Sequence, residues 1–189
     1  MKKLILSMNT TRDGFMAGPE GDISWHFPFW DEEMLAAWGK ELDHADTILL
    51  GRRTYQALAE YWSTRQYDSA IARDDLAIAE MMNTYRKVVA SKTLGTLSWA
   101  NSVTINEIPQ QVAELKLAPG KDIVVFGSTL LTDLLIEHDL VDRYVLWEHP
   151  VCIQKGRRLF RIGRFPKNLT LVDVALLRSG VIKRSYERQ

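Results

Sequence analysis

The sequence of 189 residues contains a single cysteine, Cys152, and no long uninterrupted apolar run. One thiol excludes an internal disulfide and any zinc site that needs several thiolates, and its apolar neighbours Val151 and Ile153 predict a small buried side chain. No stretch of about 18 apolar residues and no charged-then-apolar N-terminal signal occurs, which predicts a soluble, cytoplasmic protein without membrane contact.

The sequence also lacks an excess of charge of either sign. Lys plus Arg and Asp plus Glu number 24 each, and the resulting net charge of zero argues against a broad nucleic-acid-binding surface. No linker rich in Pro, Gly or Ser divides the chain, and 46% of its residues are apolar. Residues 1–189 are therefore expected to form one domain with a sizeable core.

Several familiar catalytic motifs are missing. The chain has no G-x-G-x-x-G after its first apolar segment, no G-x-x-x-x-G-K-[ST] phosphate loop and no G-x-S-x-G nucleophile elbow. The four histidines share no spacing typical of metal ligands, so no metal site is expected. They are His26, His44, His138 and His149.

The most informative stretch that is present covers residues 122–136. Residues 123–126 form an apolar run too short for a helix, which indicates a strand buried on both faces, and Gly127 ends it. Four leucines between 130 and 135 then place one apolar stripe on a helix that Ser128 or Thr129 can cap. A glycine turn before a helix lets a phosphate approach unpaired N–H groups, although the same turn also suits an ordinary strand-to-helix connection.

Strands and helices alternate along most of the remaining chain. Strands are predicted over 4–8, 47–50, 88–90 and 103–105, and helices after Asp31, over 52–60 and 73–83, and from Pro109. After Asp139 only strands are predicted, over 144–147, 151–153, 169–177 and 181–186, with a basic loop over 154–163. The last two strands flank a hairpin turn, which predicts a mainly parallel sheet closed by an antiparallel hairpin.

Two neighbouring segments near the N-terminus suggest a binding site. Residues 9–21 carry Gly14, Gly18 and Gly21 and predict a long loop of the kind that often acts as a lid. An aromatic segment from Trp25 to Trp30 follows it.

Five stretches in one order together resemble the dihydrofolate reductase superfamily. They are SMNTTRDGFMAG (7–18), ADTILLGRRTY (45–55), KVVASKTL (87–94), IVVFGSTLL (123–131) and GRRLF (156–160). The likeness is closer to the bacterial branch that resembles the C-terminal reductase domain of the bifunctional riboflavin biosynthesis protein. It implies a three-layer α/β/α fold, NADPH as hydride donor and, as in relatives, a homodimer. The zinc deaminase signature of the bifunctional protein is absent, so at most the reductase half is present.

The resemblance implies which residues hold the cofactor. The implied cofactor-binding residues are Ser7, Gly14, Gly51, Arg52, Arg53, Thr54, Ser91, Lys92, Gly127, Ser128, Thr129 and Leu130. The chemistry of these side chains agrees, because the planar fork of Arg52 suits a phosphate and Thr54 places a hydroxyl in the first turn of a helix. The alternatives are solvated helix-start arginines at Arg52 and Arg53 and a plain strand end at Ser91 and Lys92.

The resemblance also implies a catalytic carboxylate and a substrate wall. Trp25, Pro28 and Asp31 resemble the Trp-x-x-Pro-x-Asp region in which a carboxylate binds a pterin and assists its protonation, but one additional residue separates Pro28 from Asp31 here. Asp31 is the catalytic candidate, and its alternative role is that of a helix N-cap. Trp25, Phe27 and Trp30 are expected to contact a planar substrate ring.

Two departures from the family pattern bear on function. Ser128 stands at the second position of a Gly-Gly turn, where a backbone geometry reserved for glycine would be lost. Gln154-Lys155-Gly156 replaces a glycine-rich stretch, which argues against the substrate of the riboflavin pathway itself.

These observations leave three hypotheses. The leading one is an NADPH-dependent reductase of a small heterocycle, pterin-like or ribosylamino-pyrimidine-like. The alternatives are a non-catalytic ligand-binding module with the same fold and a self-associating domain paired through its antiparallel edge. The reductase hypothesis requires the turns at Gly51 and Gly127 to lie side by side, so that both helix starts face one diphosphate.

Overall fold

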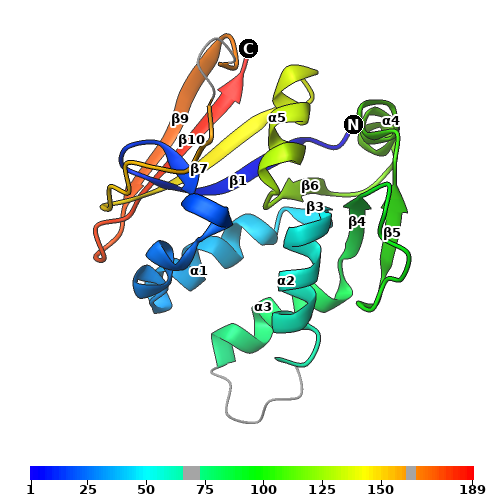
Figure 1. The fold of residues 1–189 in the computed structure, drawn as a ribbon, viewed down its shortest axis with the longest axis horizontal. Coiled ribbons are helices and arrows are strands. Elements are labelled where there is room, and N and C mark those ends of the chain that lie inside the picture. Colours follow the sequence, from blue (N-terminus) through cyan, green and yellow to red (C-terminus); the bar gives the residue numbers. More distant parts are fainter. Residues whose placement is uncertain (66–72, 161–164) are drawn as a thin grey trace.

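The computed structural model describes residues 1–65, 73–160 and 165–189, and Figure 1 shows their arrangement. The strands are β1 (Leu4–Thr11), β2 (Phe15–Ala17), β3 (Ala45–Gly51), β4 (Arg86–Ala90), β5 (Ser102–Ile105), β6 (Asp122–Val125), β7 (Arg143–His149), β8 (Arg157–Arg158), β9 (Leu169–Leu176) and β10 (Ile182–Arg188). The helices are α1 (Glu32–Leu42), α2 (Arg52–Trp62), α3 (Arg73–Thr84), α4 (Ile108–Leu117) and α5 (Thr129–Glu137). Two short 3-10 helices span Pro19–Gly21 and Ser24–Phe29.

Eight of the strands form one sheet in the order β5-β4-β3-β6-β1-β7-β10-β9. Neighbouring strands from β5 to β7 run parallel, whereas β10 pairs antiparallel with both β7 and β9. The mainly parallel sheet with a C-terminal antiparallel hairpin, predicted from the sequence, is therefore confirmed.

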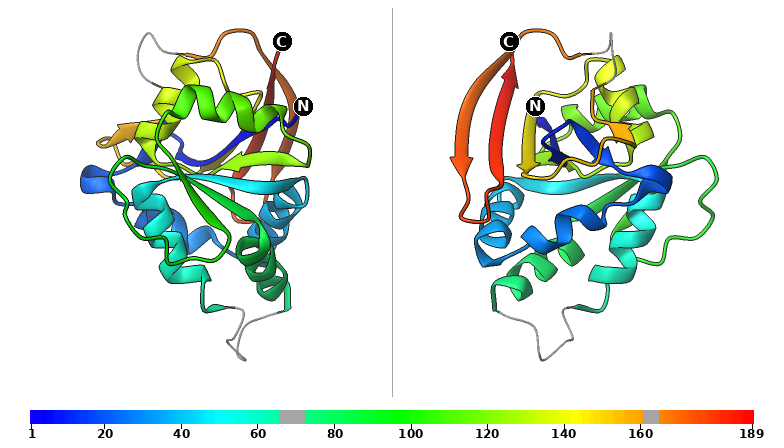
Figure 2. Two further views of the ribbon diagram at one scale, coloured as in Figure 1. Left: turned by 90° about the vertical axis from the view of Figure 1, so that its right-hand side faces the viewer. Right: turned by 60° about the vertical axis from the view of Figure 1, so that its left-hand side comes forward.

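Helices cover both faces of this sheet, as the two sides of Figures 1 and 2 show. Side chains of α1, α2 and α3 pack in one core with Ile5 of β1, and side chains of α4 and α5 pack in a second core with Leu4 and Leu6. The alternation of adjacent β1 residues between two cores explains why the central strands are apolar on both faces. The three-layer α/β/α arrangement is confirmed.

The segment predicted as a long loop over 9–21 is partly strand. β1 continues to Thr11, and β2 pairs antiparallel with β8 in a separate two-stranded sheet. The turn between β1 and β2 is closed by a hydrogen bond from the Gly14 N–H to the Thr11 carbonyl (2.9 Å) and by one from the Phe15 N–H to the Thr11 hydroxyl (2.9 Å). Gly14 therefore marks a tight turn between two strands, and the predicted long loop was wrong at residues 9–11 and 15–17.

The strand predicted over residues 151–153 is also absent from the structure, and Cys152 is exposed, not buried. The backbone here pairs with a side chain instead of a strand, since the Asp13 carboxylate accepts hydrogen bonds from the N–H groups of Ile153 (3.4 Å) and Gln154 (2.8 Å). An apolar run of three residues contained no information about this distant acceptor. Residues 161–163 of the predicted basic loop lie outside the described ranges.

Candidate functional site

The turns that follow β3 and β6 are in direct contact. The Gly51 N–H donates a hydrogen bond to the Gly127 carbonyl oxygen (2.9 Å), and a Cβ on Gly51 would lie only 2.3 Å from the Ser128 Oγ. Because β3 and β6 are parallel neighbours, their carboxyl ends meet at one edge of the sheet. The side-by-side arrangement predicted for the two glycine turns is present.

Among the described residues, no side chain caps the helices that leave these turns. Gly51 is the N-cap of α2 and Ser128 is the N-cap of α5, and neither helix start donates a hydrogen bond to a capping side chain. The first N–H groups of two helices of 11 and 9 residues therefore remain available at adjacent points. Such a pair of helix starts, each with partial positive charge, can hold a diphosphate.

Serine at position 128 does not conflict with the backbone of this turn. Ser128 has φ −80° and ψ 174°, an ordinary extended conformation, whereas Gly127 has φ 118°, which favours glycine. The peptide bond between them is cis. The expected loss of a glycine-only geometry at Ser128 is therefore wrong, because that geometry falls on Gly127. The Thr54 hydroxyl lies against this glycine, 3.3 Å from where a Cβ would stand.

Arg52 connects α2 to the loop that follows β4. Its guanidinium Nη1 donates to the Thr93 hydroxyl (2.8 Å), while the Ser91 hydroxyl accepts from the N–H groups of Thr93 (3.2 Å) and Leu94 (3.0 Å). Ser91 thus has a structural task in shaping this loop. The predicted residues Arg53, Lys92 and Leu130 are exposed at the same edge of the sheet.

Arg157 approaches the same edge from β8. Its guanidinium donates to the Thr129 hydroxyl (3.0 Å) at the first residue of α5, so a cation flanks the second helix start. The sequence analysis missed both Arg157 and Thr93. Only the repeated Arg-Arg of the GRRLF stretch could have drawn attention to Arg157.

Ser7 and Gly14, predicted as cofactor contacts, occupy different surroundings. The Ser7 hydroxyl accepts a hydrogen bond from the Trp147 indole N–H (3.0 Å) within the core, and only 4% of Ser7 is exposed. Gly14, with φ 84°, lies in the β1–β2 turn beside Arg158 and its carbonyl accepts from the Leu159 N–H (3.2 Å).

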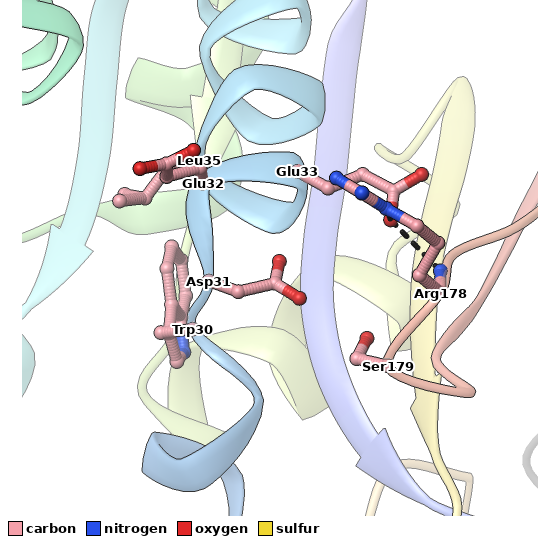
Figure 3. A pocket seen from close by; sticks show the side chains of 7 residues that line it. All are labelled: Trp30, Asp31, Glu32, Glu33, Leu35, Arg178 and Ser179. Atoms are coloured by element: carbon pink, nitrogen blue, oxygen red, sulfur yellow. Dashed lines mark hydrogen bonds and ion pairs between the residues drawn. The ribbon is translucent and has the colours of Figure 1, made fainter.

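Asp31 caps α1 and borders an open pocket. Its carboxylate accepts a hydrogen bond from the Met34 N–H (2.8 Å), which satisfies one of the donors at the helix start. A pocket of about 670 Å³ lies against this helix start and the β9–β10 turn (Figure 3). The residues that line it are Trp30, Asp31, Glu32, Glu33, Leu35, Arg178 and Ser179. Glu33 and Arg178 form an ion pair across it (3.2 Å).

The aromatic segment before Asp31 divides between two directions. Trp30 packs edge-on against Trp38 (ring centroids 5.5 Å apart), whereas Trp25 packs edge-on against His149 (5.3 Å). Phe27 is 59% exposed, although its ring touches His26. Trp25 and Trp30 thus pack against different partners and Phe27 is largely exposed, so a single aromatic wall against a substrate ring stays a prediction.

Comparison with known proteins identifies the family of this chain. Residues 2–183 match the model of the RibD C-terminal domain. The chain belongs to the RibD C-terminal domain family. Among its relatives is an uncharacterized protein of Bacillus subtilis, YyaP, with 29% identity over 98% of this chain and 94% of YyaP. The family predicted from the sequence is confirmed.

Two solved structures share the fold of this RibD C-terminal domain. A putative riboflavin biosynthesis protein of Shewanella sp. PV-4 superposes with a TM-score of 0.67 at 16% identity, over 100% of this chain and 99% of the other. Dihydrofolate reductase of Enterococcus faecalis, complexed with NADP(H) and RAB-propyl, superposes with a TM-score of 0.66 at 12% identity, over 99% and 96%. Both proteins are similar in architecture, and the family and fold are those of reductases.

Two buried histidines, His26 and His149, lie close together in this domain. The rings of His26 and His149 lie 6.0 Å apart, and both side chains are buried. Burial and then the nearby charge of His149 lower the pKa of His26 to about 4, and burial also lowers the pKa of His149. Both imidazoles are therefore neutral at pH 7. Spacing in the sequence could not reveal a pair separated by more than half the chain.

The described residues contain neither a metal-ligand cluster nor a helix suited to span a membrane. Within 1–65, 73–160 and 165–189, no three His, Cys, Asp or Glu side chains gather as a metal site requires. None of the helices in these ranges combines the length and apolarity needed to span a bilayer.

Proposed function

We propose that this RibD C-terminal domain is an NADPH-dependent reductase of a small heterocyclic substrate, pterin-like or ribosylamino-pyrimidine-like. The observation that carries the proposal is the contact between Gly51 and Gly127, which places two uncapped helix starts next to each other. Two such starts match the two phosphates of a dinucleotide. The bound cofactor would supply the hydride, and the protein would supply placement and a proton.

The charged side chains around the turns fit an anionic cofactor. Arg52 stands beside the first helix start, where its fork suits the 2′-phosphate that distinguishes NADPH from NADH, together with the loop of Ser91 and Thr93. Arg157 stands beside the second helix start and suits the diphosphate. The two cations would thus divide the phosphates between them.

The substrate ring would lie along the aromatic segment next to Asp31. Phe126, directly before Gly127, packs on Trp38 (5.1 Å), and Trp38 packs on Trp30 (5.5 Å), so aromatic contacts extend from the cofactor turn to the substrate wall. Asp31 lines the pocket beside Trp30 and is the candidate to hold a proton for the substrate.

Calorimetry with NADPH tests this function. Binding at micromolar concentration is expected, followed by oxidation of NADPH in the presence of a member of a dihydropterin and aminopyrimidine panel. Absence of NADPH binding at tens of micromolar would refute the reductase proposal. Tight binding without turnover across the panel would favour a non-catalytic ligand-binding module, an alternative that the engagement of Asp31 as an N-cap supports.

We also propose that two copies of the chain pair through β9. This strand ends the eight-stranded sheet, and no strand of the described part of the chain pairs with the outer row of its backbone N–H and C=O groups. It also exposes four large apolar side chains, Leu171, Val172, Val174 and Leu176. A dimer mass in multi-angle light scattering, reduced to a monomer by Val174→Lys, is expected, and a monomeric wild-type protein at high micromolar concentration would contradict it.

A further inference from the structure

His149, the last residue of β7, is fully buried and yet has an unused nitrogen. Its side chain is 0% exposed, and its Nε2 has no hydrogen-bond partner among the described residues. The other nitrogen, Nδ1, lies 2.9 Å from the Trp147 carbonyl oxygen. Because a carbonyl can only accept, Nδ1 carries the proton that faces the Trp147 carbonyl, and the Thr10 backbone also interacts with the ring. In this neutral tautomer Nε2 is a lone-pair acceptor.

None of the described rings around His149 donates a hydrogen bond to its Nε2. Trp25 meets it edge-on with centroids 5.3 Å apart, Phe29 edge-on at 5.4 Å, and His26 at a tilt of 41° and 6.0 Å. The Trp25 indole N–H is itself buried without an acceptor. A donor and an acceptor thus share one aromatic enclosure without bonding to each other, which is unfavourable unless a third group completes them.

A second unused acceptor lies on the neighbouring strand. The Oδ1 atom of Asn9 is buried and has no partner among the described residues. In the parallel ladder of β1 and β7, Asn9 pairs with Trp147 and Thr11 pairs with His149. Since residues two apart point to the same face of a strand, the side chains of Asn9 and His149 share one face of the sheet.

This enclosure is continuous with the cofactor turns. β1 and β7 follow β6 in the sheet order, so the carboxyl ends of all three strands lie along one edge. His26 contacts Trp30 (6.0 Å), the far end of the aromatic series that starts at Phe126 beside Gly127. A ring bound beside His149 would therefore lie next to the proposed cofactor, in one continuous site.

We propose that His149 Nε2 and Asn9 Oδ1 recognise the substrate ring, each accepting a hydrogen bond from a ring N–H or amino group, while Trp25 and Phe29 pack against it. This inference rests on the proposed function and specifies its substrate class. The ligand is a planar heterocycle that presents at least two N–H donors on one edge.

Access to His149 requires the covering segment to move, and its attachment permits this. Every hydrogen bond that residues 18–30 make with described residues stays inside that segment, for example Gly18 N–H to the Asp22 carbonyl (2.7 Å) and the Trp30 indole N–H to His26 Nδ1 (2.9 Å). Only side-chain packing holds it on the sheet. A ligand ring that replaces His26 over His149 would break no hydrogen bond between the segment and the rest of the protein.

A pair of probes tests the recognition in the wild-type protein, because methyl groups replace both ring N–H donors in one of them and leave its amino group in place. The probes are 6-aminouracil and its 1,3-dimethyl derivative, which lacks both ring N–H groups. In long-range ¹H–¹⁵N spectra, 6-aminouracil should move the His149 Nε2 resonance to that of a hydrogen-bonded nitrogen, and it should bind about tenfold more tightly than the dimethyl compound. Equal binding of the two probes, no binding of either, or an unchanged Nε2 resonance would overturn the proposal.

Variants then assign the effect to His149. His149→Phe keeps an aromatic ring but removes the acceptor, and it should lose about tenfold in 6-aminouracil affinity while its affinity for the dimethyl probe stays unchanged. His149→Gln returns an acceptor and should recover part of the loss, and His138→Gln, at an exposed histidine, is the control. A His149→Phe variant that binds both probes as the wild type does would refute the assignment. If these variants fail to fold, the wild-type spectra remain decisive.

A parallel NADPH titration separates this inference from the proposed function. If the protein binds NADPH but does not discriminate between the probes, the ring-recognition proposal is refuted and the reductase proposal is not. If the protein discriminates between the probes but does not bind NADPH, the reductase proposal is refuted and ring recognition is not.

Discussion

The backbone N–H of Gly51 is bonded to the carbonyl oxygen of Gly127, and no side chain fits between these two turns. The β3–α2 and β6–α5 connections therefore form one rigid unit at the carboxyl edge of the sheet. The close approach explains glycine at position 51 without any need for an unusual backbone, because Gly51 has φ −76°.

Gly51→Ala is expected to destabilise the protein and weaken NADPH binding. The added Cβ would stand 2.3 Å from the Ser128 Oγ and 2.9 Å from the Ser128 backbone nitrogen, so the two turns must separate. Overpacking of this kind costs about 1–3 kcal/mol in the free energy of unfolding. Chemical denaturation and NADPH titration measure both effects. Gly95→Ala, where a Cβ would meet nothing within 4 Å, is the matched control. Equal free energies of unfolding for the two variants would contradict the prediction and show that the turns separate without cost.

Arg52→Glu should distinguish the two nicotinamide cofactors. If the guanidinium binds the 2′-phosphate, reversal of its charge should lower NADPH affinity by about 10- to 100-fold and change NADH affinity little. Fluorescence titration with each cofactor gives the ratio. An equal loss for both cofactors would place Arg52 elsewhere on the nucleotide.

Arg157→Ala should have a different signature. Arg157 adjoins Thr129 at the start of α5, beside the turn assigned to the diphosphate that both cofactors contain. NADPH and NADH affinities are therefore expected to fall together, by about tenfold. Lys155→Ala removes an exposed cation from the same loop and serves as the control. A loss confined to NADPH would assign Arg157 to the 2′-phosphate.

Asp31 can be tested for its two roles separately, because asparagine caps helices as well as aspartate does. Asp31→Asn should keep the hydrogen bond to the Met34 N–H and leave stability unchanged, whereas Asp31→Ala should lose about 1 kcal/mol. A catalytic carboxylate would make both variants inactive. Thermal unfolding together with the rate of NADPH oxidation decides the matter, and full activity of Asp31→Asn would leave Asp31 as a cap alone.

The buried His26 should make the protein sensitive to mild acid. Its pKa is about 4 in the folded state and about 6.5 when unfolded, so the unfolded chain binds more protons between these values. Stability should therefore fall as the pH drops from about 6.5 to 4, by roughly 3 kcal/mol in total from this group. His26→Gln, which retains an acceptor for the Trp30 indole, should flatten that part of the profile. Parallel profiles of variant and wild type, from urea unfolding at stepped pH, would contradict the assignment.

Local patterns in the sequence determined the fold class and much of the sheet edge that is proposed to bind the cofactor. The apolar runs that end at Gly51 and Gly127, each followed by a helical stripe, predicted two strand-to-helix turns, and Asp31 before a helical repeat predicted an N-cap. These features depend on residues within about one helical turn of each other, and such short-range preferences can be identified from residue order.

Only the tertiary structure decided which distant residues complete the site. Arg52 meets Thr93 across 41 residues, Arg157 meets Thr129 across 28, and His26 in the 3-10 helix Ser24–Phe29 faces His149 at the end of β7. It likewise placed residues 9–11 and 15–17 in strands and left Cys152 exposed. Strand order and register fix such contacts, and because they arise from packing of the whole chain, no local run of residues encodes them.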